Sequence, residues 1–160
     1  MAADRIEKQA RLGAPLERVW RAISDAREFG AWFGMSFDGP FVAGQPVSGR
    51  LTPTQVDKEV ARLQAPHAGL RFEFMVELIE PPLRLVLGWH PFAIDPAVDY
   101  SAEPMTRIEF RLEDADGGTT RLTITESGFE RLPPERRAAA FEANSGGWSH
   151  QLRLIEKYLN

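Results

Sequence analysis

The chain has 160 residues, of which 43% are hydrophobic and 26% charged, a length and balance that predict one folded domain over residues 1–160 rather than a disordered chain. Its formal charge of -4, with Arg136-Arg137 as the longest basic run, argues against a nucleic acid as the main partner, and the absence of cysteine excludes a disulfide framework, a thiolate metal site and a cysteine nucleophile. Because there is no stretch of about 18 apolar residues and no signal-peptide-like start, we expect no membrane span and a cytoplasmic location.

The first elements predicted are a strand and two short helices. Residues Arg5–Leu12 alternate between apolar and polar side chains, which is the pattern of a half-buried strand. Pro15 then opens a helix, because proline tolerates a helix start. The apolar residues of that helix recur at helical spacing and are Leu16, Val19, Trp20 and Ile23. A second short helix is expected over 26–33.

Two short strands are expected next, near Met35–Phe37 and Pro46–Leu51, with a turn rich in glycine and proline between them. Residues 53–69 show only weak periodicity between two prolines. We therefore interpret 53–69 as an insertion, with one helical turn near Val56–Leu63.

Four further strands have clear period-2 patterns. In each of the first three, alternate apolar residues share one face, which we expect to point inward. These residues are Phe72, Phe74, Val76 and Leu78 in the first, Leu83, Leu85, Leu87 and Trp89 in the second, and Ile108, Phe110 and Leu112 in the third. A loop over 91–104 separates the second strand from the third. The turn Asp116-Gly117-Gly118 leads into the last strand, which runs to Glu126 with Leu122 and Ile124 facing inward.

A long helix is predicted from Pro134 to Leu159. Its inward face repeats at spacings of three and four and comprises Phe141, Asn144, Trp148, Leu152, Ile155 and Leu159. The pair Gly146-Gly147 lies inside this helix, where each glycine costs about 1 kcal/mol relative to alanine. We therefore expect another part of the protein, most simply the sheet backbone, to pack closely against this turn.

The order of these elements predicts an α+β fold. Seven antiparallel strands form a curved sheet, two short helices follow the first strand, and the long C-terminal helix closes the sheet over an apolar cavity.

Several segments resemble one superfamily. They are APLERVWRAISD at 14–25 with Trp32-Phe33, EPPLRLV at 80–86, LTITESGF at 122–129, and NSGGW at 144–148. Together they resemble the START-like, birch-pollen-allergen-like helix-grip superfamily, in the branch named after the activator of the heat-shock chaperone ATPase. The resemblance spans nearly the whole chain, although the 53–69 insertion and the 91–104 loop depart from shorter members.

The resemblance implies a fold more than an activity. Members of the superfamily are lipid and hydrophobe carriers, aromatic cyclases and dehydrases, hormone receptors and co-chaperones. The shared segments carry no catalytic residue that transfers to this chain, and a fold alone does not specify a function. The inserted segment and the loop are expected to shape the mouth of the cavity.

The residues offer little support for metal or cofactor chemistry. His67, His90 and His150 have no ligand spacing, so we expect no metal site. There is no Gly-x-Ser-x-Gly elbow and no phosphate-binding glycine loop, so no cofactor is predicted.

The carboxylates are expected to be solvated. Asp38, Glu73, Glu109 and Glu126 would serve as general acids only if buried. Glu126, next to the Gly128 turn, is the most interesting of them, but a turn-capping role accounts for it. No catalytic residue is therefore predicted.

The aromatic residues point to the cavity, although a filled core would use them as well. The predicted cavity walls are Trp32, Phe33, Phe72, Phe74, Val76, Leu87, Trp89, Ile108, Phe110, Ile124, Phe141, Asn144, Trp148 and Leu152. Polar groups expected beside them are His90 and Tyr100. The indole N–H groups of Trp89 and Trp148 are also expected there, because each needs a partner when buried.

Three functions follow as hypotheses. The first is noncatalytic binding of a small hydrophobic ligand, such as a lipid, an aromatic compound or a polyketide-like molecule. The second is a protein-interaction module that acts on a chaperone ATPase. The third is a cyclase, dehydrase or hydrolase that uses the same cavity, which requires buried histidine or carboxylate groups inside it. Either a monomer or a homodimer is compatible with the sequence.

Overall fold

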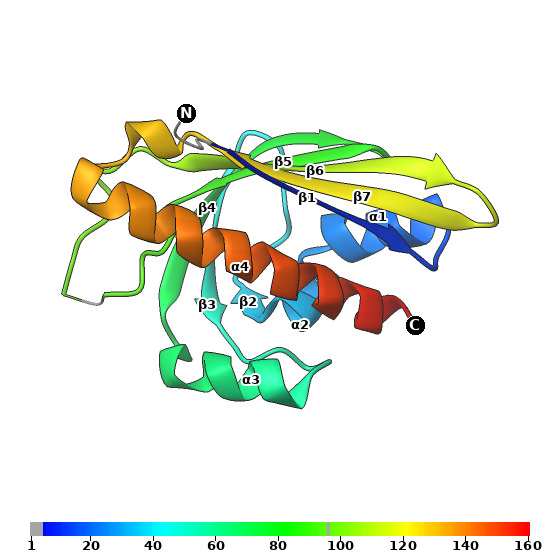
Figure 1. Cartoon of the computed structure of the whole chain (residues 1–160), viewed down its shortest axis with the longest axis horizontal. Helices are drawn as coiled ribbons and strands as arrows, with labels where there is room; N and C mark the ends of the chain where they lie inside the picture. Colours follow the sequence, from blue (N-terminus) through cyan, green and yellow to red (C-terminus); the bar gives the residue numbers. More distant parts are fainter. Residues whose placement is uncertain (1–4, 96) are drawn as a thin grey trace.

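The computed structural model of the chain describes residues 5–95 and 97–160 (Figure 1). The elements, in chain order, are β1 (Arg5–Leu12), α1 (Leu16–Ser24), α2 (Ala26–Phe33), β2 (Met35–Phe37), β3 (Pro46–Leu51), α3 (Lys58–Gln64), the 3-10 turn η1 (Ala65–His67), β4 (Arg71–Glu80), β5 (Arg84–Trp89), β6 (Thr106–Ala115), β7 (Thr119–Ser127), the 3-10 turn η2 (Phe129–Arg131) and α4 (Pro134–Leu159).

The described strands form one antiparallel sheet in the order β1-β7-β6-β5-β4-β3-β2. Figure 1 shows α4 crossing the sheet, with α2 next to it and α3 set apart on the side of β2 and β3. This arrangement confirms the predicted α+β helix-grip fold.

One hydrophobic core joins the sheet to the helices. Its largest fully buried side chains include Trp32, Phe29, Phe74, Phe110 and Phe129. Because α4 and the two short helices each present an apolar stripe to the sheet, the curved sheet encloses these rings on one side.

The two short helices begin and end for identifiable reasons. The Asp25 carboxylate accepts hydrogen bonds from the first backbone N–H groups of α2, and Gly34 ends α2 in the left-handed conformation with a φ of 98°. A side chain at Gly30 would place its Cβ 2.0 Å from the carbonyl oxygen of Met35. Glycine at that position therefore lets β2 return directly against α2.

The inserted segment is a helix tied to its surroundings at both ends. The expected helical turn is offset, because Asp57 caps α3 and fixes its start at Lys58. The Gln64 side chain accepts from the backbone N–H of Thr54 and donates to the Phe33 carbonyl. At the other end, Lys157 of α4 forms a 2.6 Å ion pair with Asp57.

Two details of the predicted packing are wrong. Leu83 was expected to face inward with the strand that follows it, but it lies in the turn before β5 and is 44% exposed. The predicted inward face of α4 omitted Leu154, which is buried together with Trp148, Leu152 and Ile155. The long helix packs against both β1 and α2, so it buries a wider stripe than one row of residues.

Candidate functional site

A buried carboxylate lies beneath α4. Glu126, near the end of β7, has a relative exposure of 0%. Its Oε1 accepts hydrogen bonds from Trp148 Nε1 at 2.8 Å and from Asn144 Nδ2 at 2.9 Å. Its Oε2 accepts from Trp89 Nε1 at 2.8 Å and from Thr106 Oγ1 at 2.5 Å.

These four donors connect three neighbouring strands to the helix. Trp89 ends β5, Thr106 begins β6, and Asn144 and Trp148 lie one turn apart on α4. An ionised carboxylate only accepts hydrogen bonds and offers about four lone-pair positions, so the four donors use its capacity in full. Glu126 therefore holds both indole rings and the Asn144 amide in fixed orientations.

The placement of Glu126 corrects our expectation of a solvated carboxylate or a turn cap. It occurs in phase with Thr120, Leu122 and Ile124, all of which are buried on the inner face of β7. The period-2 pattern carried this signal, but the charge of Glu126 led us to place it on the outer face.

Three aromatic rings pack against one another and line a small space next to this network. The ring centroids of Phe33, Trp89 and Trp148 are mutually 6.0–6.1 Å apart. Behind them, Phe74 stacks on Trp89 and Phe110 meets Trp148 edge-on. These separations are typical of favourable aromatic pairs.

The space between these rings and α4 is a pocket of about 70 Å³. Its walls are Phe33, Trp89, Asn144, Gly147, Trp148 and Gln151. The four residues from α4 follow the helical spacing i, i+3, i+4, i+7, which places them on one face. The same spacing in the sequence indicates that Gln151 shares this face, although it was not among the predicted wall residues.

Gly146 and Gly147 do not have the role that we expected. A Cβ atom added to either glycine would meet no described atom within 4 Å, so nothing packs closely against this turn. Instead, Gly147 lines the pocket and leaves open the space that a side chain would fill. Gly146 is exposed and does not line the pocket.

The other predicted wall residues lie outside this pocket. Most are packed in the core, namely Trp32, Phe74, Val76, Leu87, Ile108, Phe110, Ile124 and Leu152. Phe141 packs on Phe129 with ring centroids 5.2 Å apart, and Phe72 lines a different hollow.

His90 and Tyr100 lie together in that second hollow, which has a volume of about 230 Å³. Burial lowers the pKa of His90 below its usual value, and the nearby Glu103 and Glu73 oppose this effect. The Nδ1 atom of His90 is buried, and no described residue forms a hydrogen bond with it. These two polar groups are therefore separate from the pocket beneath α4.

Arg136 of α4 fastens the loop beside this second hollow. Its guanidinium donates to both carboxylate oxygens of Glu103 and to the carbonyls of Pro91 and Phe92, at distances from 2.8 to 3.1 Å. The same guanidinium lies 4.7 Å from the ring centroid of Tyr100.

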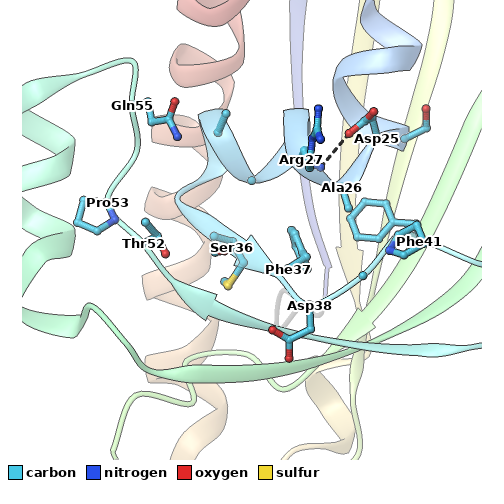
Figure 2. Close-up of a pocket in the computed structure, with 16 residues that line it drawn as sticks. Asp25, Ala26, Arg27, Ser36, Phe37, Asp38, Phe41, Thr52, Pro53 and Gln55 are labelled. Atoms are coloured by element: carbon cyan, nitrogen blue, oxygen red, sulfur yellow. Dashed lines mark hydrogen bonds between the residues drawn. The ribbon is translucent and has the colours of Figure 1, made fainter.

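A larger groove lies on the side of α2 and β2. Its volume is about 840 Å³, and it is lined by residues at the start of α2, by β2 with the turn after it, and by the segment 52–55. Figure 2 shows Thr52, Pro53 and Gln55 at the left of this groove, Asp25 and Phe41 at the right, and Asp38 at the bottom. Of its lining residues, the sequence drew attention only to Asp38, as a general acid if buried, and Asp38 is exposed.

The remaining candidate groups are engaged elsewhere. Asp38 pairs with Arg71 at 3.0 Å and Glu109 with Arg84 at 2.9 Å, while Glu73 is exposed. Among residues 5–95 and 97–160, no three histidine or acidic side chains gather in a way that could hold a metal ion. Within the same residues, no helix is both long and apolar enough to cross a membrane.

The sequence matches the family described as "Activator of Hsp90 ATPase homolog 1-like protein" over residues 13–160. The chain belongs to this family. The match confirms the resemblance seen in the sequence. No curated protein matches the chain at a significant level.

Solved structures share its fold at low sequence identity. A structure from Arthrobacter aurescens has a TM-score of 0.72 and 19% identity, and the match covers 98% of this chain and 86% of that one. MLL2253 from Mesorhizobium loti has a TM-score of 0.68 and 22% identity, with coverages of 97% and 96%. DynU16, a protein of the dynemicin biosynthetic locus, has a TM-score of 0.68 and 22% identity; the match covers 99% of this chain but 48% of DynU16. This chain thus spans about half the length of DynU16.

Proposed function

We propose that this protein binds a small, mainly apolar ligand, without catalysis, in the pocket beneath α4. The observation that carries the proposal is that the aromatic side chains of Phe33, Trp89 and Trp148 line a pocket, and that Gly147 has no side chain to fill it. Binding sites for small molecules are mostly apolar and aromatic, with a few polar groups that fix orientation.

The walls are prepared for binding before a ligand arrives. Trp89 and Trp148 are held by their hydrogen bonds to Glu126, so their ring planes do not have to be ordered on binding. Preorganised walls lower the entropic cost of association. The pocket thus favours a rigid, planar group over a flexible chain.

The size of the pocket sets the mode of binding. Its 70 Å³ is well below the roughly 300–1,000 Å³ of sites that enclose a drug-sized ligand. A ligand therefore inserts one ring or ring edge past Gly147, and anything larger displaces the Phe33 or Trp148 side chain. The origin of DynU16 in a biosynthetic locus adds support for a small-molecule ligand.

Glu126 supports binding rather than chemistry. It is a buried carboxylate of the kind that an enzyme would need, but it does not line the pocket. Both of its oxygens accept hydrogen bonds from protein groups, so it holds the pocket walls instead of meeting a substrate.

A matched pair of variants tests the proposal. A panel of small aromatic compounds, lipids and polyketides is titrated while the indole N–H NMR signals of Trp89 and Trp148 are followed. We expect a planar aromatic compound to shift both signals, Gly147→Leu to abolish the shift by filling the pocket, and Gly146→Leu to retain it. If no compound perturbs either indole, or if Gly147→Leu binds as well as the unchanged protein, the proposal is wrong.

A second candidate is a protein-interaction module, supported by the groove beside the edge strand β2. A partner such as a chaperone ATPase would contact exposed residues that line it, such as Arg27 and Ser36. The test is to titrate the chaperone, follow the backbone signals of β2 and measure ATP hydrolysis. Unchanged signals and an unchanged ATPase rate would dismiss this candidate.

A further inference from the structure

We infer that the ligand beneath α4 donates a hydrogen bond to Gln151, which makes it a phenol or a comparable aromatic ring bearing an O–H or N–H group. This inference rests on the proposed function and specifies the ligand class. It begins with the Gln151 side chain on α4, which lines the pocket together with the three rings.

The orientation of the Gln151 amide is fixed. Its Nε2 donates to the Phe33 carbonyl at 3.0 Å. The same carbonyl also accepts from Gln64 Nε2 at 3.2 Å. Turning the Gln151 amide over would put its oxygen against this carbonyl oxygen, and two acceptors repel one another. The other end of the Gln151 amide is therefore its Oε1 atom, which is a hydrogen-bond acceptor.

That oxygen is buried, and no described residue donates a hydrogen bond to it. A buried acceptor without a donor costs about 1–3 kcal/mol, so a group that satisfies it gains in affinity. Gln151 is the one pocket side chain whose buried polar atom lacks a partner within the part of the chain that the structure describes.

The other polar groups of the pocket reinforce this preference. The indole N–H groups of Trp89 and Trp148 and the Asn144 amide N–H all point to Glu126. The two indole donors of the walls are thus already used, and the buried polar atom left without a partner is the Gln151 Oε1 acceptor. A ligand that only accepts hydrogen bonds, such as an ether or a ketone, cannot satisfy this atom.

The rings specify the rest of the ligand. With centroids about 6 Å apart, Phe33, Trp89 and Trp148 pack on one another and together offer an aromatic surface on which a ligand ring can pack. A flat ring carrying one donor combines this packing with the hydrogen bond to Gln151. A saturated alcohol would satisfy Gln151 but lose the aromatic contacts.

The experiment compares phenol with fluorobenzene, which has a similar size and shape but no donor. Each is titrated against the unchanged protein while the Trp89 and Trp148 indole signals and the Gln151 side-chain amide signal are followed by NMR. We expect phenol to bind roughly two- to tenfold more tightly than fluorobenzene, the worth of one neutral hydrogen bond. We also expect the Gln151 amide signal to move further with phenol than with fluorobenzene.

Two variants assign the preference to Gln151. Gln151→Met keeps the length of the side chain and removes the acceptor, so phenol and fluorobenzene should bind equally. Gln64→Met also loses a hydrogen bond to the Phe33 carbonyl but lies on α3 outside the pocket, so the phenol preference should remain.

The failures of the two proposals can be told apart. If fluorobenzene and phenol bind equally to the unchanged protein and both shift the indole signals, the pocket binds aromatic rings but the inference about Gln151 is wrong. The inference is also wrong if Gln151→Met retains the preference for phenol. If neither compound moves the indole signals, the proposed function falls as well.

Discussion

The groove beside β2 is the larger of the two hollows, whereas the pocket beneath α4 has the more organised walls. The groove is about twelve times larger, about 840 Å³ against about 70 Å³, and seven of its 16 lining residues are exposed to solvent. The pocket is small, yet a single buried carboxylate orients three of its six wall residues. The volume of a hollow and the organisation of its walls are therefore separate properties, and a specific ligand site needs placed polar groups as well as space.

The largest expected effect comes from the carboxylate that organises the pocket. Glu126→Gln places an amide N–H₂ among four donors, and at least one of them loses its acceptor. We expect the free energy of unfolding to fall by about 2–4 kcal/mol, measured by chemical denaturation.

Asp38→Asn is the control for this change, because it removes an acidic charge beside the groove. Asp38 and its partner Arg71 are 55% and 51% exposed, so we expect a loss below about 1 kcal/mol. Equal losses for the two variants would contradict the contrast between an organised pocket and a loosely organised groove.

A smaller effect of opposite sign is expected at the two glycines of α4. Gly146→Ala and Gly147→Ala each add a Cβ that meets no described atom within 4 Å, so each should stabilise the helix by about 0.5–1 kcal/mol. The midpoint of urea denaturation measures this gain. A loss of stability in either variant would show that this turn is packed after all, as the sequence alone had led us to expect.

The smallest effect concerns the link between α3 and α4. The hydrogen bond from Lys157 is the main cause that lowers the pKa of Asp57 from 3.8 to about 2. Because the folded-state pKa is lowered, this carboxylate contributes stability above its unfolded pKa and loses that contribution as the pH falls through about 2. The effect is small because the pair lies near the surface, where the Lys157 side chain is 54% exposed and solvent screens the two charges.

Asp57→Asn keeps a side-chain oxygen that can cap α3 and removes the charge. Acid titration of stability should show a slightly larger loss in the unchanged protein than in Asp57→Asn between about pH 5 and pH 2. If the two acid profiles superimpose, the ion pair with Lys157 contributes nothing to holding α3 against α4.

Much of the fold followed from patterns that local physics determines. Alternation along β1 and along β4 to β7, and the helical repeat from Pro134 to Leu159, arise because each element must bury one face. The bounds of α3 were less accurate, since they depend on the capping of one helix by Asp57 rather than on periodicity.

The site was harder to predict, because it depends on contacts between distant elements. Trp89 and Trp148 were expected to need polar partners, but the partner itself, Glu126, was placed on the outer face because charged side chains are rarely buried. The pocket requires α4 to lie in one register on β5 and α2, which no local pattern specifies. For the same reason, we expected close packing against Gly147, whereas this glycine lines the pocket and leaves space beside it.

The most direct test of the account is the detection of intermolecular nuclear Overhauser effects between protein protons and a bound aromatic ligand. We expect contacts from the ligand ring to the Trp148 indole, the Phe33 ring and the Gly147 α-protons, and their loss in Gly147→Leu. Contacts confined to residues of the groove beside β2, such as Phe37 and Phe41, would contradict the assignment of the ligand site to the pocket beneath α4.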